Sequence, residues 1–241
     1  MTPRARPLWR SVLDGAAALG MLVASAVLIW VSLTNRASPF TDTANDQVPV
    51  EPLSLAGAVV RGNAHAPLAI IEYSDFSCPF CAQFATQTLP SLEERYIRPG
   101  RVLFAYRPLP LESLHPLALR AAQAAECANR QGRFWELHDR LLQNDRTGAG
   151  GDFVEHARSL GLNAEAFTEC LAKDEVSNAI RRDVAEAKKL HITGTPTFLV
   201  GVVLPDGRVR IRRRLFGARS VQDFTDVIEP LLVRQPAARN R

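Results

Sequence analysis

The stretch Ser77-Cys78-Pro79-Phe80-Cys81 places two cysteines three residues apart, a few residues after an apolar run. Pro79 suits the first turn of a helix, where its missing N–H is not needed, so a helix is predicted to begin there. Positions i and i+3 share one helix face, at a spacing that a disulfide tolerates. A helix N-terminus also stabilises an anion, which should make the sulfur of Cys78 thiolate-prone. The pattern therefore predicts a disulfide that forms and breaks reversibly.

The apolar run before the cysteines covers residues 68–73 and is typical of a central strand buried on both faces. Glu72 is the exception in this run, and burying an unpaired carboxylate is costly. One interpretation is that Glu72 lies at the end of the strand with its carboxylate in water. The interpretation that we favour is a buried acid beneath the cysteine pair, which relays protons as the thiols titrate.

The remaining pattern predicts a mixed α/β domain. Strands are expected at residues 58–61, 68–73, 101–106, 197–200 and 209–211. A helix is expected over residues 79–97 with a kink at Pro90, and about five helices between residues 114 and 190. Ser220 should cap a last amphipathic helix. We therefore predict a mixed central sheet with a helical subdomain inserted between its halves.

The chain has 241 residues and four cysteines, so disulfides are not needed to replace a hydrophobic core. Four cysteines allow three pairings, of which we favour Cys78 with Cys81 and Cys127 with Cys170. The second pair lies in apolar helical contexts and is predicted to be a structural clamp rather than a second redox relay. A structural zinc site would need another closely spaced pair of ligands, so neither a metal nor another cofactor is expected.

The formal net charge is +4, but the positive charge is concentrated at the two ends of the chain. Residues 1–36 carry four arginines against one aspartate, and residues 205–241 carry nine arginines against four acidic residues. The centre is therefore net acidic, which argues against binding to nucleic acid. The five arginines within residues 208–214 are expected to form a solvated strand face that protects the sheet edge. Contact of this face with anionic lipid is the alternative.

An uncharged apolar segment runs from Gly15 to Leu33, close to the length of about 20 residues that spans a bilayer. We predict an uncleaved single-pass anchor over residues 15–34, with residues 1–14 in the cytoplasm because arginines precede the segment. A proline-containing linker is expected over residues 35–57. The alternative is a cleaved signal peptide, whose apolar core would be shorter and end at a small-x-small site. Both interpretations export the rest of the chain to an oxidising compartment.

Four pieces of the sequence together resemble the DsbA-like branch of the thioredoxin superfamily. They are Glu72-Tyr73-Ser74-Asp75-Phe76-Ser77-Cys78-Pro79-Phe80-Cys81, Ala124-Ala125-Glu126-Cys127-Ala128, Phe134-Trp135-Glu136-Leu137-His138-Asp139 and Gly194-Thr195-Pro196-Thr197-Phe198. The resemblance extends from about Val59 to Leu232. It implies a thioredoxin fold over residues 58–234 with a helical insertion at about 114–190, and leaves residues 235–241 as a disordered tail.

The resemblance also implies roles for the motif residues. Cys78 would be the exposed nucleophile and Cys81 the buried resolving cysteine. A cis peptide bond between Thr195 and Pro196 would pack beside the two sulfurs. Of the five histidines, only His191, which lies close to Pro196 in the sequence, is a candidate for a role at this site.

One departure from the family concerns the residues between the cysteines. The best-known DsbA oxidases carry Pro-His there, whereas this chain has Pro79-Phe80. Phe80 cannot donate a hydrogen bond to the Cys78 thiolate, so the oxidising strength is left open. Phe80 could instead offer an apolar surface to partner chains.

The resemblance implies a thiol-disulfide oxidoreductase in the bacterial inner membrane, with its catalytic domain in the periplasm or outside the cell. Its partners would be exported proteins that contain cysteines, the membrane itself, and a membrane redox protein that resets the cysteine pair. We expect the oxidase direction. The alternatives are a reductase or isomerase acting on exported or cytochrome-maturation substrates, and a non-catalytic thioredoxin-fold chaperone or metallochaperone.

Overall fold

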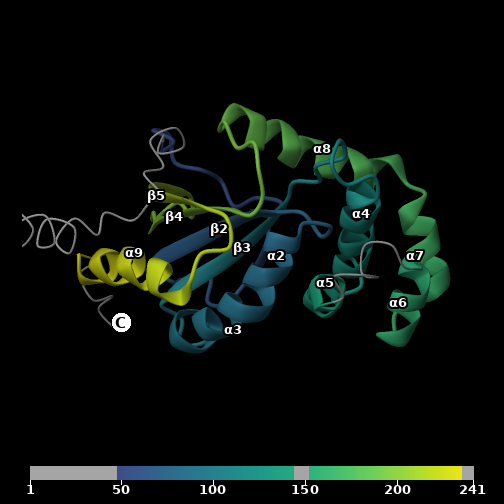
Figure 1. The fold of residues 1–241 in the computed structure, drawn as a ribbon, viewed down its shortest axis with the longest axis horizontal. Helices are drawn as coiled ribbons and strands as arrows, with labels where there is room; N and C mark the ends of the chain where they lie inside the picture. The colour runs from purple at the N-terminus through teal and green to yellow at the C-terminus, as the bar shows by residue number, and fades with distance from the viewer. Residues whose placement is uncertain (1–47, 144–151, 235–241) are drawn as a thin grey trace, which may run out of the picture. The chain divides into compact units, whose positions relative to one another are not determined.

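The computed structural model describes residues 48–143 and 152–234 (Figure 1). The predicted cytoplasmic residues 1–14, the anchor at 15–34, most of the linker and the tail at 235–241 lie outside these described residues. Within the described ranges, no helix is both long and apolar enough to cross a membrane.

A five-stranded sheet forms the centre of the described domain, in the order β1-β3-β2-β4-β5. The strands are β1 (Val59–Arg61), β2 (Leu68–Ser74), β3 (Val102–Pro108), β4 (Thr197–Val203) and β5 (Val209–Phe216). β2 pairs in parallel with β3, and the other neighbouring strands pair antiparallel. Every residue of β2 is buried, as its apolar sequence predicts for a central strand.

The helical segments of the described residues lie between β2 and β3, between β3 and β4, and after β5. They are α2 (Pro79–Gln83), η1 (Phe84–Thr88), α3 (Leu89–Leu92), η2 (Glu93–Ile97), α4 (Ala118–Asn129), α5 (Phe134–Gln143), α6 (Phe153–Ser159), α7 (Ala164–Leu171), α8 (Asp174–Lys189) and α9 (Val221–Val233). Ser220 caps α9 as predicted, in a capping box with Asp223. Figure 1 shows α4, α5, α6 and α7 grouped beside the sheet, on the side opposite to α9.

The helix predicted over residues 79–97 differs from a regular helix with one kink. Two turns of it, η1 and η2, are π-helical. Pro90 has no N–H to donate to the carbonyl of Thr86, so a regular α-helical ladder is interrupted there. The preceding turn widens, and the N–H of Leu89 donates to the carbonyl of Phe84.

The two faces of β2 contribute to different parts of the core. Leu68 and Ile70 belong to a cluster that contains Phe224 of α9. Ala69 and Ile71 belong to another cluster, with residues of β3, β4 and the end of α8. This alternation follows from the strand period of two, and it buries β2 on both faces.

β5 continues to Phe216, further than predicted, and its arginines do not all face solvent. Arg214 is buried, and its Nη2 donates to the carbonyl of Leu190 at 2.6 Å. The cause is a β-bulge, because Val200 pairs with Arg213 whereas the next residue of β4 pairs with Ile211. The extra residue turns part of β5 over. The predicted solvated face is therefore wrong for Arg214.

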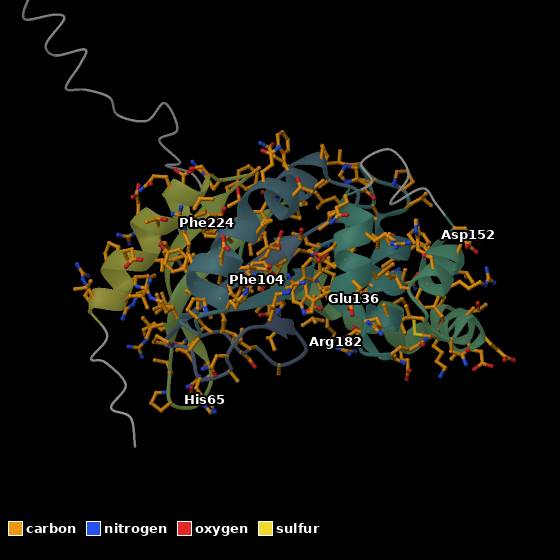
Figure 2. The ribbon with its side chains drawn as sticks, turned by 90° about the horizontal axis from the view of Figure 1, so that it is seen from below. His65, Phe104, Glu136, Asp152, Arg182 and Phe224 are labelled. Carbon is orange, nitrogen blue, oxygen red and sulfur yellow. A yellow bond between two sulfur atoms is a disulfide. The ribbon has the colours of Figure 1, made fainter. Side chains whose placement is uncertain are left out.

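A disulfide joins Cys127 of α4 to Cys170 of α7 (Figure 2). The two sulfurs are buried in the helical block, and 43 positions separate the residues in sequence. The pair therefore clamps two helices of the inserted part.

Replacing both Cys127 and Cys170 by alanine should lower the free energy of unfolding by about 2–4 kcal/mol, because the cross-link restricts the unfolded chain. Denaturant unfolding of wild type and variant measures the difference. An unchanged unfolding midpoint would contradict the clamp.

Candidate active site

Cys78 and Cys81 lie at the beginning of α2. Cys78 is the N-cap residue with an extended backbone, and Pro79 occupies the first turn as the sequence predicts. The N–H of Cys81 donates to the carbonyl of Cys78 at 3.1 Å. Both thiols are free in this structure, so the geometry is that of the reduced pair.

The exposure of Cys78 differs from the expectation, whereas Cys81 is buried as expected. Cys78 is only 5% exposed, whereas an exposed nucleophile was expected, and Cys81 is fully buried. The Sγ of Cys78 lies 3.4 Å from the carbonyl oxygen of Thr195, so the loop before β4 covers it. Phe80 is 58% exposed, and Pro79 beside it is exposed as well, so the two residues between the cysteines face outward.

The loop that covers Cys78 is held on both sides. The peptide bond between Thr195 and Pro196 is cis. The carbonyl of Pro196 accepts a hydrogen bond from the N–H of Gly217 at 2.8 Å, which ties the loop to the end of β5. A Cβ on Gly194 would lie 2.8 Å from the ring of Phe216, so a larger residue could not pack there.

The environment separates the acidities of the two thiols. A hydrogen bond from the Cys81 thiol lowers the pKa of Cys78 to about 6, although burial acts in the opposite direction. Backbone groups at the start of α2 add to this lowering. Burial raises the pKa of Cys81 well above its ordinary value, and the charges of Cys78 and Glu72 raise it further. At neutral pH the pair therefore holds one thiolate, on Cys78, and one proton, on Cys81.

Glu72 lies within β2, opposite Tyr106 of β3 and Phe198 of β4. It is 1% exposed, which contradicts the alternative that its carboxylate reaches water. Neither carboxylate oxygen makes a close hydrogen bond with a described residue, and Ser74 is the polar group near enough to lower the pKa of Glu72. Burial raises the pKa of Glu72 to about 8, and the charge of Cys78 adds to the rise. The side chain is thus able to hold or release a proton near neutral pH.

Asp75 connects the active-site turn to a second loop that the sequence did not indicate. Its N–H donates to the Sγ of Cys81 at 3.5 Å. Its buried carboxylate accepts from the N–H of Ser77 at 2.8 Å and from the N–H of Leu111 at 2.9 Å, and lies 2.8 Å from Nδ1 of His115. The only signal for this role was the position of an aspartate three residues before Cys78.

The histidines at the site are His115 and His138, whereas the sequence suggested His191. His115, 40 positions after Asp75, contacts the active-site turn. His138 of α5 is completely buried and lies edge-on to Phe76, with ring centroids 5.8 Å apart. His191 is instead an exposed residue in the turn after α8. Proximity of this kind comes from the tertiary fold and leaves no pattern in a single sequence.

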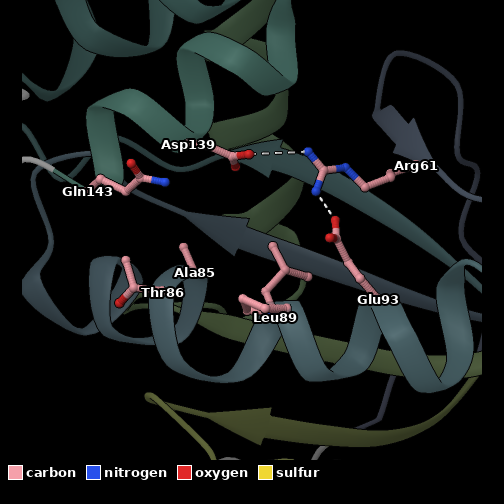
Figure 3. A pocket seen from close by; sticks show the side chains of 8 residues that line it. Arg61, Ala85, Thr86, Leu89, Glu93, Asp139 and Gln143 are labelled. Atoms are coloured by element: carbon pink, nitrogen blue, oxygen red, sulfur yellow. Dashed lines mark ion pairs between the residues drawn. The ribbon is translucent and has the colours of Figure 1, made fainter.

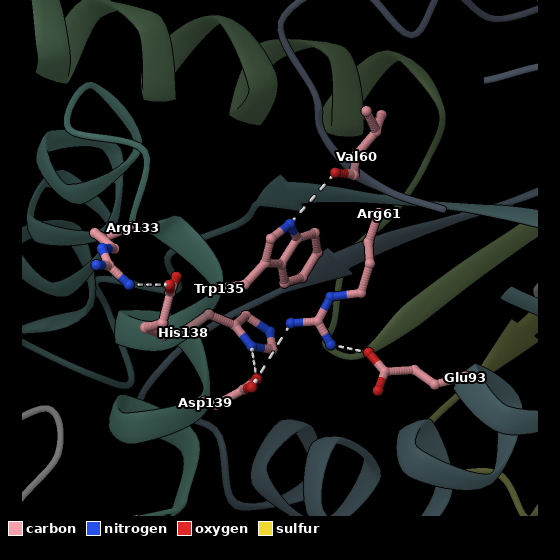
Figure 4. A network of polar contacts seen from close by, with 8 residues as sticks. Val60, Arg61, Glu93, Arg133, Trp135, His138 and Asp139 are labelled. Atoms are coloured by element: carbon pink, nitrogen blue, oxygen red, sulfur yellow. Dashed lines mark hydrogen bonds and ion pairs between the residues drawn. The ribbon is translucent and has the colours of Figure 1, made fainter. Parts of the chain in front are cut away.

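A polar network fixes the inserted helices to the edge of the sheet. Arg61 of β1 forms ion pairs with Glu93 of η2 and Asp139 of α5 (Figure 3). Its guanidinium lies 4.2 Å from the ring centroid of Trp135, and Asp139 contacts Nδ1 of His138 at 2.8 Å (Figure 4). The pocket in Figure 3, of about 340 Å³, is lined by this network and not by the cysteines. The network positions α5, and with it the ring of His138, against the active-site turn.

Comparisons with known proteins agree with this fold. A family model described as thioredoxin matches residues 54–211. Alpha-DsbA1 from Wolbachia pipientis has a TM-score of 0.66 and 26% identity, over 76% of this chain and 94% of that one. DsbA2 from Pseudomonas aeruginosa has a TM-score of 0.57 and 26% identity, over 71% of this chain and 92% of that one.

Curated relatives match over part of their length. The Na(+)/H(+) antiporter NhaA 3 of Salinispora tropica is 40% identical over 141 residues, which are 58% of this chain and 21% of the relative. NhaA 1 of Mycobacterium sp. strain KMS is 31% identical over 192 residues, which are 76% of this chain and 30% of the relative. The chain thus spans less than a third of the length of these relatives.

Replacing Glu72 by glutamine should stabilise the folded protein at pH 8 but not at pH 4. Below about pH 4.5 the carboxyl group is protonated in both states; as the pH rises toward 8, it ionises only in the unfolded chain, so stability is lost. The 4.5-to-8 shift corresponds to a gain on the order of 4 kcal/mol for Glu72→Gln at pH 8. Urea unfolding at both pH values measures it.

The matched control is Glu169→Gln, at an exposed position of α7, which should change stability little at either pH. If Glu72→Gln leaves the free energy of unfolding at pH 8 unchanged, the carboxylate is not buried as described.

Proposed function

The chain belongs to the thioredoxin family as a DsbA-like member, and we propose on this basis that it is a thiol-disulfide oxidoreductase that oxidises exported proteins through Cys78 and Cys81. The observation that carries the proposal is the opposite shift of the two thiol pKa values within one helical turn. A static disulfide or a metal site has no need of this asymmetry.

The exchange starts from the oxidised pair. A substrate thiolate attacks the Sγ of Cys78, the bond between Cys78 and Cys81 breaks, and its electron pair leaves on Cys81. A second thiolate of the substrate then attacks the substrate sulfur of the mixed disulfide, and Cys78 leaves as a thiolate. The substrate loses two electrons and gains a disulfide, while the cysteine pair gains two electrons.

The oxidase direction is supported by the acidity of Cys78. A thiol whose pKa is lowered to about 6 is a good leaving group, and stabilising its thiolate stabilises the reduced form of the pair. A stable reduced form drives the oxidation of the substrate. Phe80 argues against a strong oxidase, because it brings no hydrogen-bond donor to the Cys78 thiolate. The second candidate is therefore a reductase or isomerase, which would run the same steps in reverse.

Glu72 serves this cycle as the proton donor and acceptor of Cys81. When Cys81 leaves as a thiolate, the protonated carboxyl group of Glu72 supplies the proton. In the reverse direction the carboxylate takes the proton of the Cys81 thiol, so that Cys81 can attack the mixed disulfide. A pKa of about 8 supports both transfers near neutral pH.

An apolar surface around the covered thiol suits substrates with exposed hydrophobic segments. The residues of this surface are exposed and apolar. They are Phe80 of α2, Leu114 and Leu117 near His115 in the sequence, and Phe216, whose ring lies against Gly194. Unfolded exported chains present apolar side chains together with cysteines, so this surface supports contact with them. It also supports the non-catalytic chaperone, which the variants below distinguish from the enzyme.

The proposed location rests on the sequence outside the described residues. The segment at 15–34 would anchor the chain as a single span of the bacterial inner membrane and place the domain in the periplasm or outside the cell. A membrane redox protein would then remove the two electrons from the reduced pair after each cycle.

Cys78→Ser should reduce oxidation of a dithiol peptide by glutathione disulfide to the uncatalysed background, because no thiolate remains to form the mixed disulfide. Cys81→Ser should instead accumulate a mixed disulfide at Cys78, visible as a mass increase. A peptide fluorescence assay and intact mass measure the two outcomes.

The Cys127→Ala/Cys170→Ala variant is the control and should retain activity while it stays folded. Equal rates for wild type and Cys78→Ser would exclude the enzyme and leave the chaperone function.

A further inference from the structure

Tyr106 lies directly opposite Glu72 in the parallel pair of β2 and β3. Its side chain is 1% exposed, and its hydroxyl has no hydrogen-bond partner among the described residues. The hydroxyl of Ser74 and both carboxylate oxygens of Glu72 likewise make no close hydrogen bond with a described residue. Glu72 and Ser74, two positions apart, lie on the same side of the strand. The hydroxyl of Ser74 is near enough to Glu72 and to Tyr106 to lower the pKa of each, so it links the two side chains.

Electrostatics indicate that this cluster, formed by Glu72, Ser74 and Tyr106, lies close to the buried sulfur. Burial raises the pKa of Tyr106 well above its ordinary value, and the charges of Glu72 and then Cys81 raise it further. The charge of Glu72 likewise raises the pKa of Cys81. The hydroxyl of Tyr106 therefore stays protonated and lies within reach of the charges that change during disulfide exchange.

A pocket of about 140 Å³ connects Tyr106 with the surface of the domain. Its lining includes buried Tyr106 and Phe76, exposed Gly57, and the acidic residues Glu126 of α4 and Asp183 of α8. A cavity can hold a water molecule when the centre of that molecule has about 10–15 Å³ available to it. Tyr106 thus lines a pocket large enough for water and also faces Glu72.

We propose that Tyr106 passes protons between Glu72 and water in this pocket, which makes it a positioning residue that acts through Glu72. The inference rests on the proposed function, since each exchange adds or removes one proton at Cys81. Glu72 supplies or takes that proton, and being buried it must exchange it with water before the next cycle. The Tyr106 hydroxyl releases its own proton toward one side while it accepts another from the other side, so its charge does not change.

Other titratable groups also lie around the pair of Glu72 and Tyr106. They are Cys78 and Cys81 of α2, Asp75 of the active-site turn, His138 of α5, Glu126 of α4, and Asp183 of α8 with its partner Arg107 of β3. His138 lies edge-on to Tyr106 at 5.3 Å, but burial lowers its pKa, so it remains neutral near pH 7. Tyr106 differs from these groups in being paired with Glu72 across the strands and lining the pocket.

Tyr106→Phe tests this assignment because it removes only the hydroxyl. The ring keeps its packing against Phe76 and Phe134, at centroid distances of 5.4 and 5.2 Å. The reduced full-length chain is mixed with glutathione disulfide, and the decay of the mixed disulfide at Cys78 is followed in single turnovers between pH 5 and 9. This decay requires Cys81 to lose its proton, so its rate reports on the base.

In wild type the rate should rise with pH through about 8, the pKa of Glu72. Without the hydroxyl, Ser74 loses its interaction with Tyr106, and Ser74 is the group that lowers the pKa of Glu72, so in Tyr106→Phe the rise should move up by about one pH unit. At pH 7.5 this corresponds to a decay several-fold slower. Glu72→Gln should remove the rise, and Tyr106→Phe should add nothing in that background.

Tyr96→Phe is the matched control, because Tyr96 is also buried but its hydroxyl bonds to Thr225 of α9 at 3.3 Å. Its profile should equal that of wild type. The relay would be overturned if the decay rate of Tyr106→Phe rises at the same pH as in wild type. It would also be overturned if Tyr106→Phe slows the decay as much in the Glu72→Gln background as in wild type. If Tyr106→Phe does not fold, Ser74→Ala takes its place in the experiment. The pH at which the decay rate rises should then move upward, and a rise at the wild-type pH would overturn the relay.

Failure of the proposed function would be distinguishable from failure of the relay. If Cys78→Ser still forms the mixed disulfide, the exchange does not use Cys78, and the function fails independently of Tyr106. If wild type forms and resolves the mixed disulfide but the profile of Tyr106→Phe is unchanged, only the relay fails.

Discussion

The hydrogen bond from the buried thiol of Cys81 to the sulfur of Cys78 is the interaction on which the site depends. It is the largest influence on the acidity of Cys78, and burial is the main reason that the proton stays on Cys81. The side chain of Thr195 and then the backbone N–H groups at the start of α2 add smaller stabilisations of the thiolate. A difference in burial across one helical turn thus shifts the pKa values of two chemically identical side chains in opposite directions.

The fold maintains this difference by closing the site on three sides. β2 brings Glu72 beneath the pair, the cis loop at Thr195 and Pro196 covers Cys78, and Asp75 ties the turn to the loop of His115. The inserted helices complete the enclosure, and the ion pairs of Arg61 hold α5 against the sheet edge. These contacts explain why Cys78 is buried while Phe80 remains outside.

The sequence was informative where structure follows from local pattern. The burial of β2, the start of α2 at Pro79, the cap at Ser220 and the block of helices between β3 and β4 were all predicted, because each leaves a periodicity or a characteristic residue type. The predictions that were wrong concern residues whose exposure is decided by tertiary contacts. Arg214 turns inward after a bulge, and Cys78 is covered by a loop more than 100 positions away. Residues such as His115 and Tyr106 join the site through strand register and loop contacts, which composition and spacing do not encode.

Titration of the Cys78 thiolate, followed by its ultraviolet absorbance near 240 nm in the reduced protein, tests the central claim most directly. The account predicts a midpoint near pH 6 in wild type, and a clear upward shift in Cys81→Ala, which lacks the donating thiol. A wild-type midpoint near the ordinary thiol value of about 8.5 would contradict it, as would an unchanged midpoint in Cys81→Ala.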